Sequence, residues 1–236
     1  DIIDVGGEST RPGANEVDEA EELRRVVPVI EALAQETSAV ISVDTMKAKV
    51  ARAAMKHGAH IINDVSALTH DAALVDVAGE FGAGVVLMHM SGSPRTMQDN
   101  PAYGDVVTDV RTYLEERVTA VMGAGLSRDT LAVDPGIGFG KTAEHNVQLI
   151  AQLEAFAALE RPVLVGLSRK RFLGMLTGAP VEQRTAGSLA GLACSVMNGA
   201  HIMRVHDVRE SAQAARVAAA IRSPEQTRTW VESVTC

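Results

Sequence analysis

The segment "DPGIGFGKT" (134–142) follows the apolar run "LAV" and places three glycines around a Gly-Lys-Thr ending. A strand followed by such a loop suggests a site for nucleotide phosphates. A phosphate loop needs a glycine five positions before its Gly-Lys pair, and Pro135 stands there instead. The dinucleotide fingerprint fails too, because its third glycine would fall on Lys141. The loop is therefore expected to serve another ligand, and Lys141 is not expected to clamp a phosphate.

Other polar side chains follow short apolar runs elsewhere in the chain. One group is cationic and the other consists of carboxylates and an amide: Arg11, Lys170, Arg204 and His206, against Asp44, Asn63 and Asp134. Together they suit a ligand with an anionic end and a donor-rich end, such as a nitrogenous ring carrying a phosphate or diphosphate. Glycines at 136, 138 and 140 would let the backbone approach a flat ring closely.

Each of these positions also has a structural alternative. Asp44, Ser168 and Asp207 come before expected helices, where Asp and Ser are preferred N-caps. The pairs Asn63-Asp64 and Asp134-Pro135 are typical of turns. For His89, ordinary packing at the ends of the strands is favoured over a functional role.

Short runs rich in β-branched residues must position these groups. They are expected to be strands buried on both faces, at 1–5, 39–43, 60–63, 84–89, 131–133, 162–166 and 201–205. Amphipathic helices are expected between them, at 17–35, 47–57, 71–81, 106–122, 144–159 and 188–198. Gly58, Gly82, Gly123 and Gly199 are expected as left-handed helix caps.

Strict alternation of strand and helix predicts an α/β fold, either an open doubly wound sheet or a (β/α)₈ TIM barrel. Seven strands favour the barrel, since one more unit upstream would make eight. In both folds ligands bind at the carboxyl ends of the strands, where the polar residues stand. A single barrel domain is expected over 1–222, followed by a C-terminal tail at 223–236.

The bulk composition narrows the function further. A net charge of −8 argues against nucleic-acid binding, and the chain has no apolar run long enough to span a membrane. Cys194 and Cys236 match no metal spacing and indicate reduced thiols in a cytoplasmic protein.

Seven blocks of the chain resemble, in order, those of bacterial dihydropteroate synthase. They are "DVGGESTRPGA" (4–14), "ISVDT" (41–45), "HIINDV" (60–65), "LMHM" (87–90), "DPGIGFGK" (134–141), "GLSRKRFLG" (166–174) and "RVHDV" (204–208). The resemblance implies a (β/α)₈ barrel that joins p-aminobenzoate to 7,8-dihydropterin-6-methyl diphosphate, releases diphosphate in folate biosynthesis, and is the target of sulfonamide drugs.

The resemblance also implies residue roles. For the pterin it implies Asp44, Asn63, Met88, Asp134, Gly166 and Lys170. For p-aminobenzoate it implies Thr10, Arg11, Pro12, Phe139 and Ser168, and for the diphosphate Arg11, Arg204 and His206. Asp44, Asp134, Lys170, Arg204 and His206 are the expected catalytic residues.

The beginning of the chain departs from the family pattern. Family members start with a further strand and helix, which supply an Asn that ligates Mg²⁺ and a mobile loop. We therefore expect a barrel that lacks its first strand and helix, uses Mg²⁺, and has no metal ligand in this chain. Family resemblance also implies a homodimer through the last helices. Two alternatives stay open: a pterin-binding methyltransferase that uses methyltetrahydrofolate, and a non-catalytic pterin-binding remnant.

Overall fold

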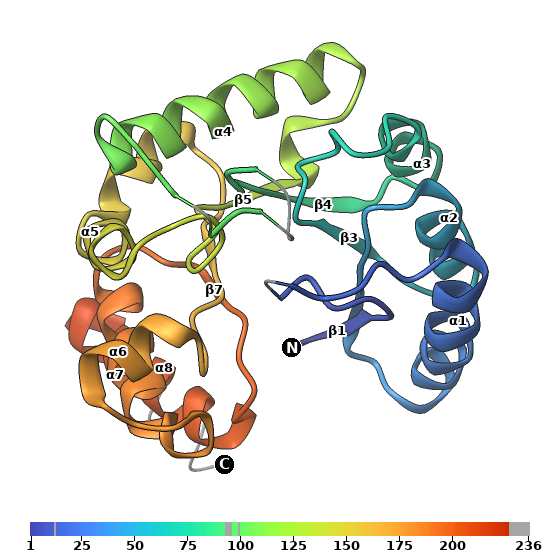
Figure 1. The fold of residues 1–236 in the computed structure, drawn as a ribbon. Coiled ribbons are helices and arrows are strands. Elements are labelled where there is room, and N and C mark those ends of the chain that lie inside the picture. Colours follow the sequence, from blue (N-terminus) through green and yellow to red (C-terminus); the bar gives the residue numbers. More distant parts are fainter. Residues whose placement is uncertain (12, 93–95, 99, 227–236) are drawn as a thin grey trace.

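A computed structural model describes residues 1–11, 13–92, 96–98 and 100–226. Strands lie inside and helices outside (Figure 1). The strands are β1 (Ile2–Gly6), β2 (Val40–Asp44), β3 (Ile61–Asp64), β4 (Gly84–Met88), β5 (Leu131–Asp134), β6 (Leu164–Val165) and β7 (Ile202–Met203).

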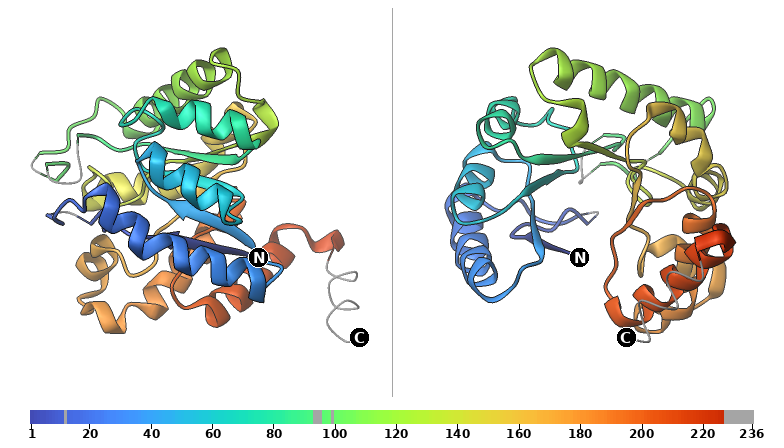
Figure 2. Two further views of the ribbon diagram at one scale, coloured as in Figure 1. Left: turned by 90° about the vertical axis from the view of Figure 1, so that its right-hand side faces the viewer. Right: turned by 180° about the vertical axis from the view of Figure 1, so that it is seen from behind.

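The α-helices are α1 (Glu19–Glu36), α2 (Ala48–Lys56), α3 (Ala73–Phe81), α4 (Val106–Gly123), α5 (Ala143–Ala151), α6 (Arg171–Thr177), α7 (Thr185–Met197) and α8 (Val208–Arg222). Short 3₁₀ helices are η1 (Arg128–Thr130), η2 (Leu153–Leu159), η3 (Val181–Gln183) and η4 (Pro224–Gln226). Figure 2 shows the helices arranged around the strands. In its left view, the segments that follow β1 and β4 project from the same end of the strands.

The strands are parallel and follow sequence order. β1 to β5 form one sheet, β6 and β7 form a second, and a parallel bridge between Val133 and Val163 links the two. Within the described part of the chain, no ladder joins β7 back to β1. Each successive strand is connected through at least one helix, as parallel pairing requires. The predicted α/β barrel with seven strands is therefore confirmed.

The central strands form because both of their faces are buried. The expectation of burial on both faces was wrong for β1, where Ile2 and Ile3 are 40% and 36% exposed. Val43 and Ile62 have no exposed surface, Leu87 has none, and the enclosing helices contribute an apolar face to the same core. On α1, for example, Val26 and Ile30 are fully buried while the opposite side of the helix is polar.

Two details of the helix prediction were wrong. The helix expected over 144–159 breaks at Gln152 into α5 and the 3₁₀ segment η2. Gly123 lies inside α4, and Gly125 takes the positive φ of 104° instead. Gly58, Gly82 and Gly199 do have positive φ, as expected of residues that end helices.

The division into a barrel domain and a tail stays a prediction. Residues 224–226 form η4, and residues 227–236 lie outside the described residues. Among the described helices, none is long and apolar enough to cross a membrane.

Candidate active site

One narrow cleft lies at the carboxyl ends of the strands. Parallel register brings Asp44 beside Asn63, and Met88 beside Asp134. Residues far apart in sequence therefore meet there. The cleft is lined by Thr10, Asp44, Asn63, Val65, Met88, Asp134, Phe139, Gly166, Lys170 and Arg204. All but Val65 were predicted site residues.

Arg204 joins the two ends of the strand series. Its Nε donates to Asp4 Oδ2 at 2.6 Å and its Nη2 donates to Asp44 Oδ2 at 3.0 Å. The Arg204 side chain, just after β7, thus reaches the middle of β1 and the end of β2. The arginine side chain is 46% exposed, whereas those of Asp4 and Asp44 are 16% and 11% exposed. The cation is positioned between the solvent and two nearly buried carboxylates.

Burial dominates the electrostatics of Asp44. Loss of solvent, followed by repulsion from Asp4, raises the pKa of Asp44 to about 7, although the positive charge of Arg204 acts in the opposite direction. This carboxyl group therefore titrates near neutral pH. Its charge state is set by which cations and hydrogen-bond donors lie beside it.

Asp134 and Lys170 form the other side of the cleft. Asp134 Oδ1 accepts a hydrogen bond from Gly136 N at 2.6 Å, and burial raises the pKa of Asp134 while Lys170 opposes that shift. Lys170 donates to the carbonyl of Ile137, and its ammonium lies 4.4 Å from the centre of the Phe139 ring. Burial lowers the pKa of Lys170 to about 8. Asp134 is thus a buried carboxyl group, and the half-buried ammonium of Lys170 favours its charged form.

Steric constraints explain why glycines occur in the 134–142 loop. Gly136 has φ 68°, and a Cβ there would lie 1.9 Å from the carbonyl oxygen of His89. At Gly138 a Cβ would lie 2.9 Å from the Lys170 side chain. The loop therefore packs its backbone against the end of β4 and against Lys170, which only glycine permits.

The Lys141 side chain is buried, and its ammonium contacts other groups of the protein. Its Nζ lies 3.0 Å from both His89 Nδ1 and Phe139 O. Burial lowers the pKa of Lys141 to about 7 and that of His89 to about 3. The His89 ring also packs edge-on against Tyr113, at 4.9 Å between ring centres. This geometry fits the packing role expected of His89, and the contacts of Lys141 Nζ lie within the protein.

Arg11, Ser168 and His206 lie outside the cleft lining. Arg11 is exposed, and Pro12 lies outside the described residues. Ser168 is buried, and its hydroxyl lies 3.0 Å from His206 Nδ1. His206 is itself exposed.

The cap alternative was wrong for Asp44 and Ser168, and for Asp207 it was right about the position. Asp44 and Ser168 do not stand at an N-cap, which Lys47 and Lys170 occupy instead. Asp207 is the N-cap of α8, but its side chain makes no capping bond there and instead accepts from Arg169 Nε at 3.1 Å. None of these three side chains therefore caps a described helix.

Asp4 is a site residue that the sequence analysis missed. Its Oδ2 accepts from both Arg204 and Asn63 Nδ2, the latter at 3.2 Å. Its Oδ1 is buried and has no partner among the described residues. The available signal was a single acidic residue inside the apolar run "DIIDV". A charged side chain that is largely shielded from solvent needs a partner, and here the partner lies 200 residues away.

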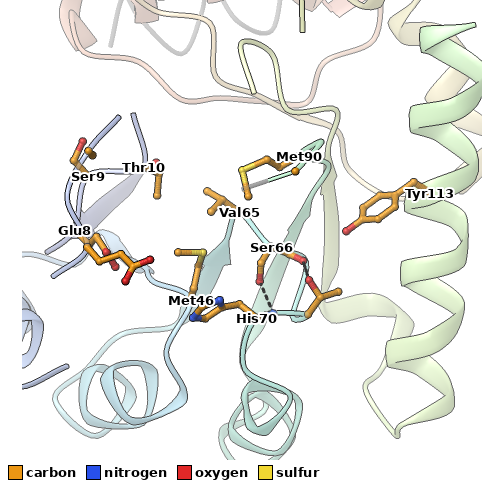
Figure 3. Close-up of a pocket in the computed structure, with 13 residues that line it drawn as sticks. Glu8, Ser9, Thr10, Met46, Val65, Ser66, His70, Met90 and Tyr113 are labelled. Atoms are coloured by element: carbon orange, nitrogen blue, oxygen red, sulfur yellow. Dashed lines mark hydrogen bonds between the residues drawn. The ribbon is translucent and has the colours of Figure 1, made fainter. Parts of the chain in front are cut away.

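A larger cavity of about 230 Å³ adjoins the cleft, beneath the segment that follows β1. Figure 3 shows Glu8, Ser9 and Thr10 on one side of it and Met90 and Tyr113 on the other. The cleft has only about 20 Å³ of open volume. We nevertheless assign the chemistry to the cleft, because the buried carboxylates and cations converge there and not in the larger cavity.

Comparisons with known proteins identify the family. The family model described as pterin binding enzyme matches residues 1–206. Dihydropteroate synthase of Escherichia coli (strain K12) is 48% identical over 229 residues, which are 97% of this chain and 81% of the relative. That of Haemophilus influenzae is 48% identical over 216 residues, covering 92% and 78%. The chain belongs to the dihydropteroate synthase family.

Solved structures agree with this assignment. Yersinia pestis dihydropteroate synthase in a sulfonamide drug complex superposes with a TM-score of 0.92 at 46% identity, covering 94% of this chain and 80% of that one. The Xanthomonas albilineans enzyme with 4-aminobenzoic acid gives a TM-score of 0.89 at 48% identity and the same coverage. The chain is therefore a transferase of this family, and the methyltransferase alternative is set aside. The expectation that a further strand precedes residue 1 stays a prediction.

Proposed function

We propose that the chain joins p-aminobenzoate to 7,8-dihydropterin-6-methyl diphosphate and releases diphosphate, using the cleft described above. The observation that carries this proposal is the position of Arg204. It sets a cation at the mouth of a cleft whose inner wall holds Asp44, Asn63 and Asp134. A ring with hydrogen-bond donors fits the wall, and its anionic substituent fits the arginine.

Pterin recognition is assigned to the inner wall. Asp134 is 7% exposed and keeps acceptor capacity beyond its bond to Gly136, so it can accept from two ring donors. Asn63 is 8% exposed, and its side-chain amide nitrogen donates a hydrogen bond to Asp4. Its side-chain oxygen remains available as an acceptor. Met88 and Gly166 supply the apolar faces. A ring without these donors would leave a buried carboxylate unsatisfied, which makes the site selective.

The reaction breaks the bond between the methylene carbon and the diphosphate oxygen and forms a bond from that carbon to the aryl nitrogen. Positive charge that spreads into the ring is stabilised by the fixed carboxylates Asp44 and Asp134. Arg204 stabilises the departing diphosphate, with His206 and Arg11 nearby on the same rim. The aryl amine then needs only correct placement, which can supply roughly 7–11 kcal/mol, and its proton leaves to solvent.

The aryl acid is assigned to the outer part of the cleft. Thr10 and Phe139 line it, and the Phe139 ring is held by the ammonium of Lys170. Ser168 is proposed near the carboxylate of p-aminobenzoate. Arg11 and Pro12 belong to the same assignment, although Pro12 lies outside the described residues.

Mg²⁺ is proposed to enter with the diphosphate. Among the described residues, no group of three or more His, Cys, Asp or Glu side chains is arranged to hold a metal. Mg²⁺ often takes substrate phosphates as ligands and keeps several waters, so the diphosphate itself would supply the coordination.

We also infer a homodimer formed through the last helices, in the cytoplasm. Large apolar side chains are exposed on α8, where Val217 and Ile221 are 62% and 63% exposed and stand one helical turn apart. Cys194, the cysteine within the described residues, is a free thiol, as expected in a reducing compartment. Sedimentation of wild type and of a Val217→Glu/Ile221→Glu variant tests the dimer, which the variant should lose.

The function is tested by incubating the chain with both substrates and Mg²⁺ and measuring dihydropteroate and diphosphate. We expect equal amounts of the two products. Asp134→Ala should abolish both the reaction and measurable pterin binding, whereas Asp129→Ala, whose side chain is 95% exposed, should retain them. A folded chain that binds pterin but forms no dihydropteroate would instead be the non-catalytic remnant.

A further inference from the structure

The connection between β1 and α1 carries Thr10 and Arg11, and one lysine fixes it at both ends. Lys47 Nζ donates to Glu8 Oε2 at 2.6 Å and to Val17 O at 2.8 Å. The other oxygen of Glu8 accepts from Val17 N at 2.9 Å. Glu8 and Val17 therefore meet at the base of the connection, and residues 9–16 form the segment between them.

This base is anchored to the core of the barrel. Lys47 Nζ also lies 2.5 Å from Glu22 Oε2, and the Glu22 side chain on α1 is completely buried. Thr45, just after β2, donates from Oγ1 to Glu22 Oε1 at 2.6 Å. The lysine, 19% exposed, thus links the connection to α1 and to the end of β2 at once.

The charges make the lysine indispensable to this arrangement. Without it, the carboxylates of Glu8 and Glu22 would face each other at 11% and 0% exposure with no cation between them. Uncompensated buried charges are strongly unfavourable. Glu22 is fixed within a packed helix, so Glu8 would move, and its bond to Val17 N would be lost with it.

Movement of Glu8 would change the segment that faces the cleft. Thr10 lines the cleft, and it also lines the larger cavity beneath the segment, together with Glu8 (Figure 3). Within the segment the described contacts are few: a turn from Arg11 O to Ala14 N at 3.1 Å, and a bond from Arg11 N to Ser9 Oγ at 3.4 Å. Its shape is therefore set mainly at its base.

We propose that Lys47 is a positioning residue for the aryl acid substrate: by holding Glu8 and Val17 together, it fixes segment 9–16 in the shape that binds p-aminobenzoate. The proposal rests on the proposed function of the cleft, which assigns Thr10 and Arg11 to that substrate. A segment held in its binding conformation loses less entropy when the substrate arrives.

The test uses Lys47→Met in the full chain. We expect the KM for p-aminobenzoate to rise about tenfold, because the segment must be ordered on binding. The Kd for the free hydroxymethyl pterin, measured by calorimetry, should stay within about twofold, because the pterin wall is untouched. Amide hydrogen exchange across 8–17 should accelerate. Lys47→Arg, which keeps the charge and donors, should restore much of the affinity for p-aminobenzoate.

Two further variants separate this role from a general loss of stability. Lys49→Met removes an exposed lysine of the same helix, paired with Glu19 at 2.8 Å and 77% exposed, and should change none of the readouts. Glu8→Gln leaves the buried Lys47–Glu22 pair intact and weakens only the interaction between Lys47 and residue 8. It should therefore reproduce the rise in KM for p-aminobenzoate.

Unchanged exchange across 8–17 together with an unchanged KM in both Lys47→Met and Glu8→Gln would overturn the proposal. An equal loss of affinity for both substrates in Glu8→Gln would also overturn it. Hydrogen exchange does not depend on catalysis. A chain that failed to make dihydropteroate, yet showed faster exchange in these variants, would refute the proposed function and not the hold of Lys47 on the segment.

Discussion

Arg204 and Asp44, 160 residues apart in the chain, form an ion pair with 3.0 Å between Nη2 and Oδ2. In the same guanidinium, Nε donates to Asp4 in the middle of strand β1. This contact spans the junction between β7 and β1, where the described residues form neither a ladder nor a bridge. The residue assigned to the diphosphate thus also connects β7 to β1 and β2.

Replacing Arg204 by Ala should weaken binding of the diphosphate end of the substrate and leave binding of the pterin ring largely unchanged. Binding of the dihydropterin diphosphate ester should weaken about thirtyfold, as expected for loss of a hydrogen-bonded charge. Binding of the free hydroxymethyl pterin should weaken far less, and calorimetry with both ligands measures the difference. Arg209→Ala, an exposed residue on α8, serves as the control and should affect neither ligand. Equal losses for the two ligands would contradict the assignment of Arg204 to the anion.

The raised pKa of Asp44 predicts opposite pH effects on stability and on binding. Burial and the neighbouring Asp4 raise this pKa from 3.8 to about 7, so between these values the native state holds a proton that the unfolded state has lost. The Asp44 contribution to stability is therefore full below about pH 4 and falls as the pH rises to 7. Pterin affinity should rise over the upper part of that range, because ring donors bind the ionised carboxylate.

Asp44→Asn tests both effects. Urea unfolding at several pH values should show the variant gaining stability relative to wild type as the pH rises from 4 to 7. The rise of pterin affinity with pH should be reduced in the same variant. A stability difference between the two proteins that does not change with pH would show that Asp44 titrates normally.

The buried Lys141 predicts a stability change at higher pH. Burial lowers its pKa from 10.5 to about 7, so between these values the unfolded state binds a proton that the native state does not. Stability should therefore rise from pH 7 to 10 in wild type, by up to about 1.4 kcal/mol per pH unit from this group. Lys141→Met should lack that rise, whereas Lys56→Met, an exposed lysine on α2, should keep it. Equal slopes in Lys141→Met and wild type would exclude a neutral buried lysine.

The order of elements could be predicted from sequence because it depends on local periodicity. Apolar runs such as 39–43 leave no polar face, and this pattern occurs in strands buried on both sides. The break of the predicted 144–159 helix at Gln152 could not be found in this way. Leu153 and Phe156 are both buried, so the apolar pattern continues through the 3₁₀ turn.

Only those residues of the candidate site that stand at the ends of predicted strands could be identified from the sequence. Residues directly after a strand, such as Asp134 and Arg204, were identifiable because parallel strands end at one rim. Asp4 and Lys47 were not, since their importance comes from partners far along the chain. Pairings of this kind depend on how the strands and helices are arranged in space, which local sequence does not encode.

The most direct test of the central claim is a crystal structure of the chain with the dihydropterin diphosphate. We predict the ring donors within about 3.2 Å of the Asp134 carboxylate, with the diphosphate against Arg204. A ring bound instead in the larger cavity beneath segment 9–16, between Glu8 and Tyr113, would contradict the account.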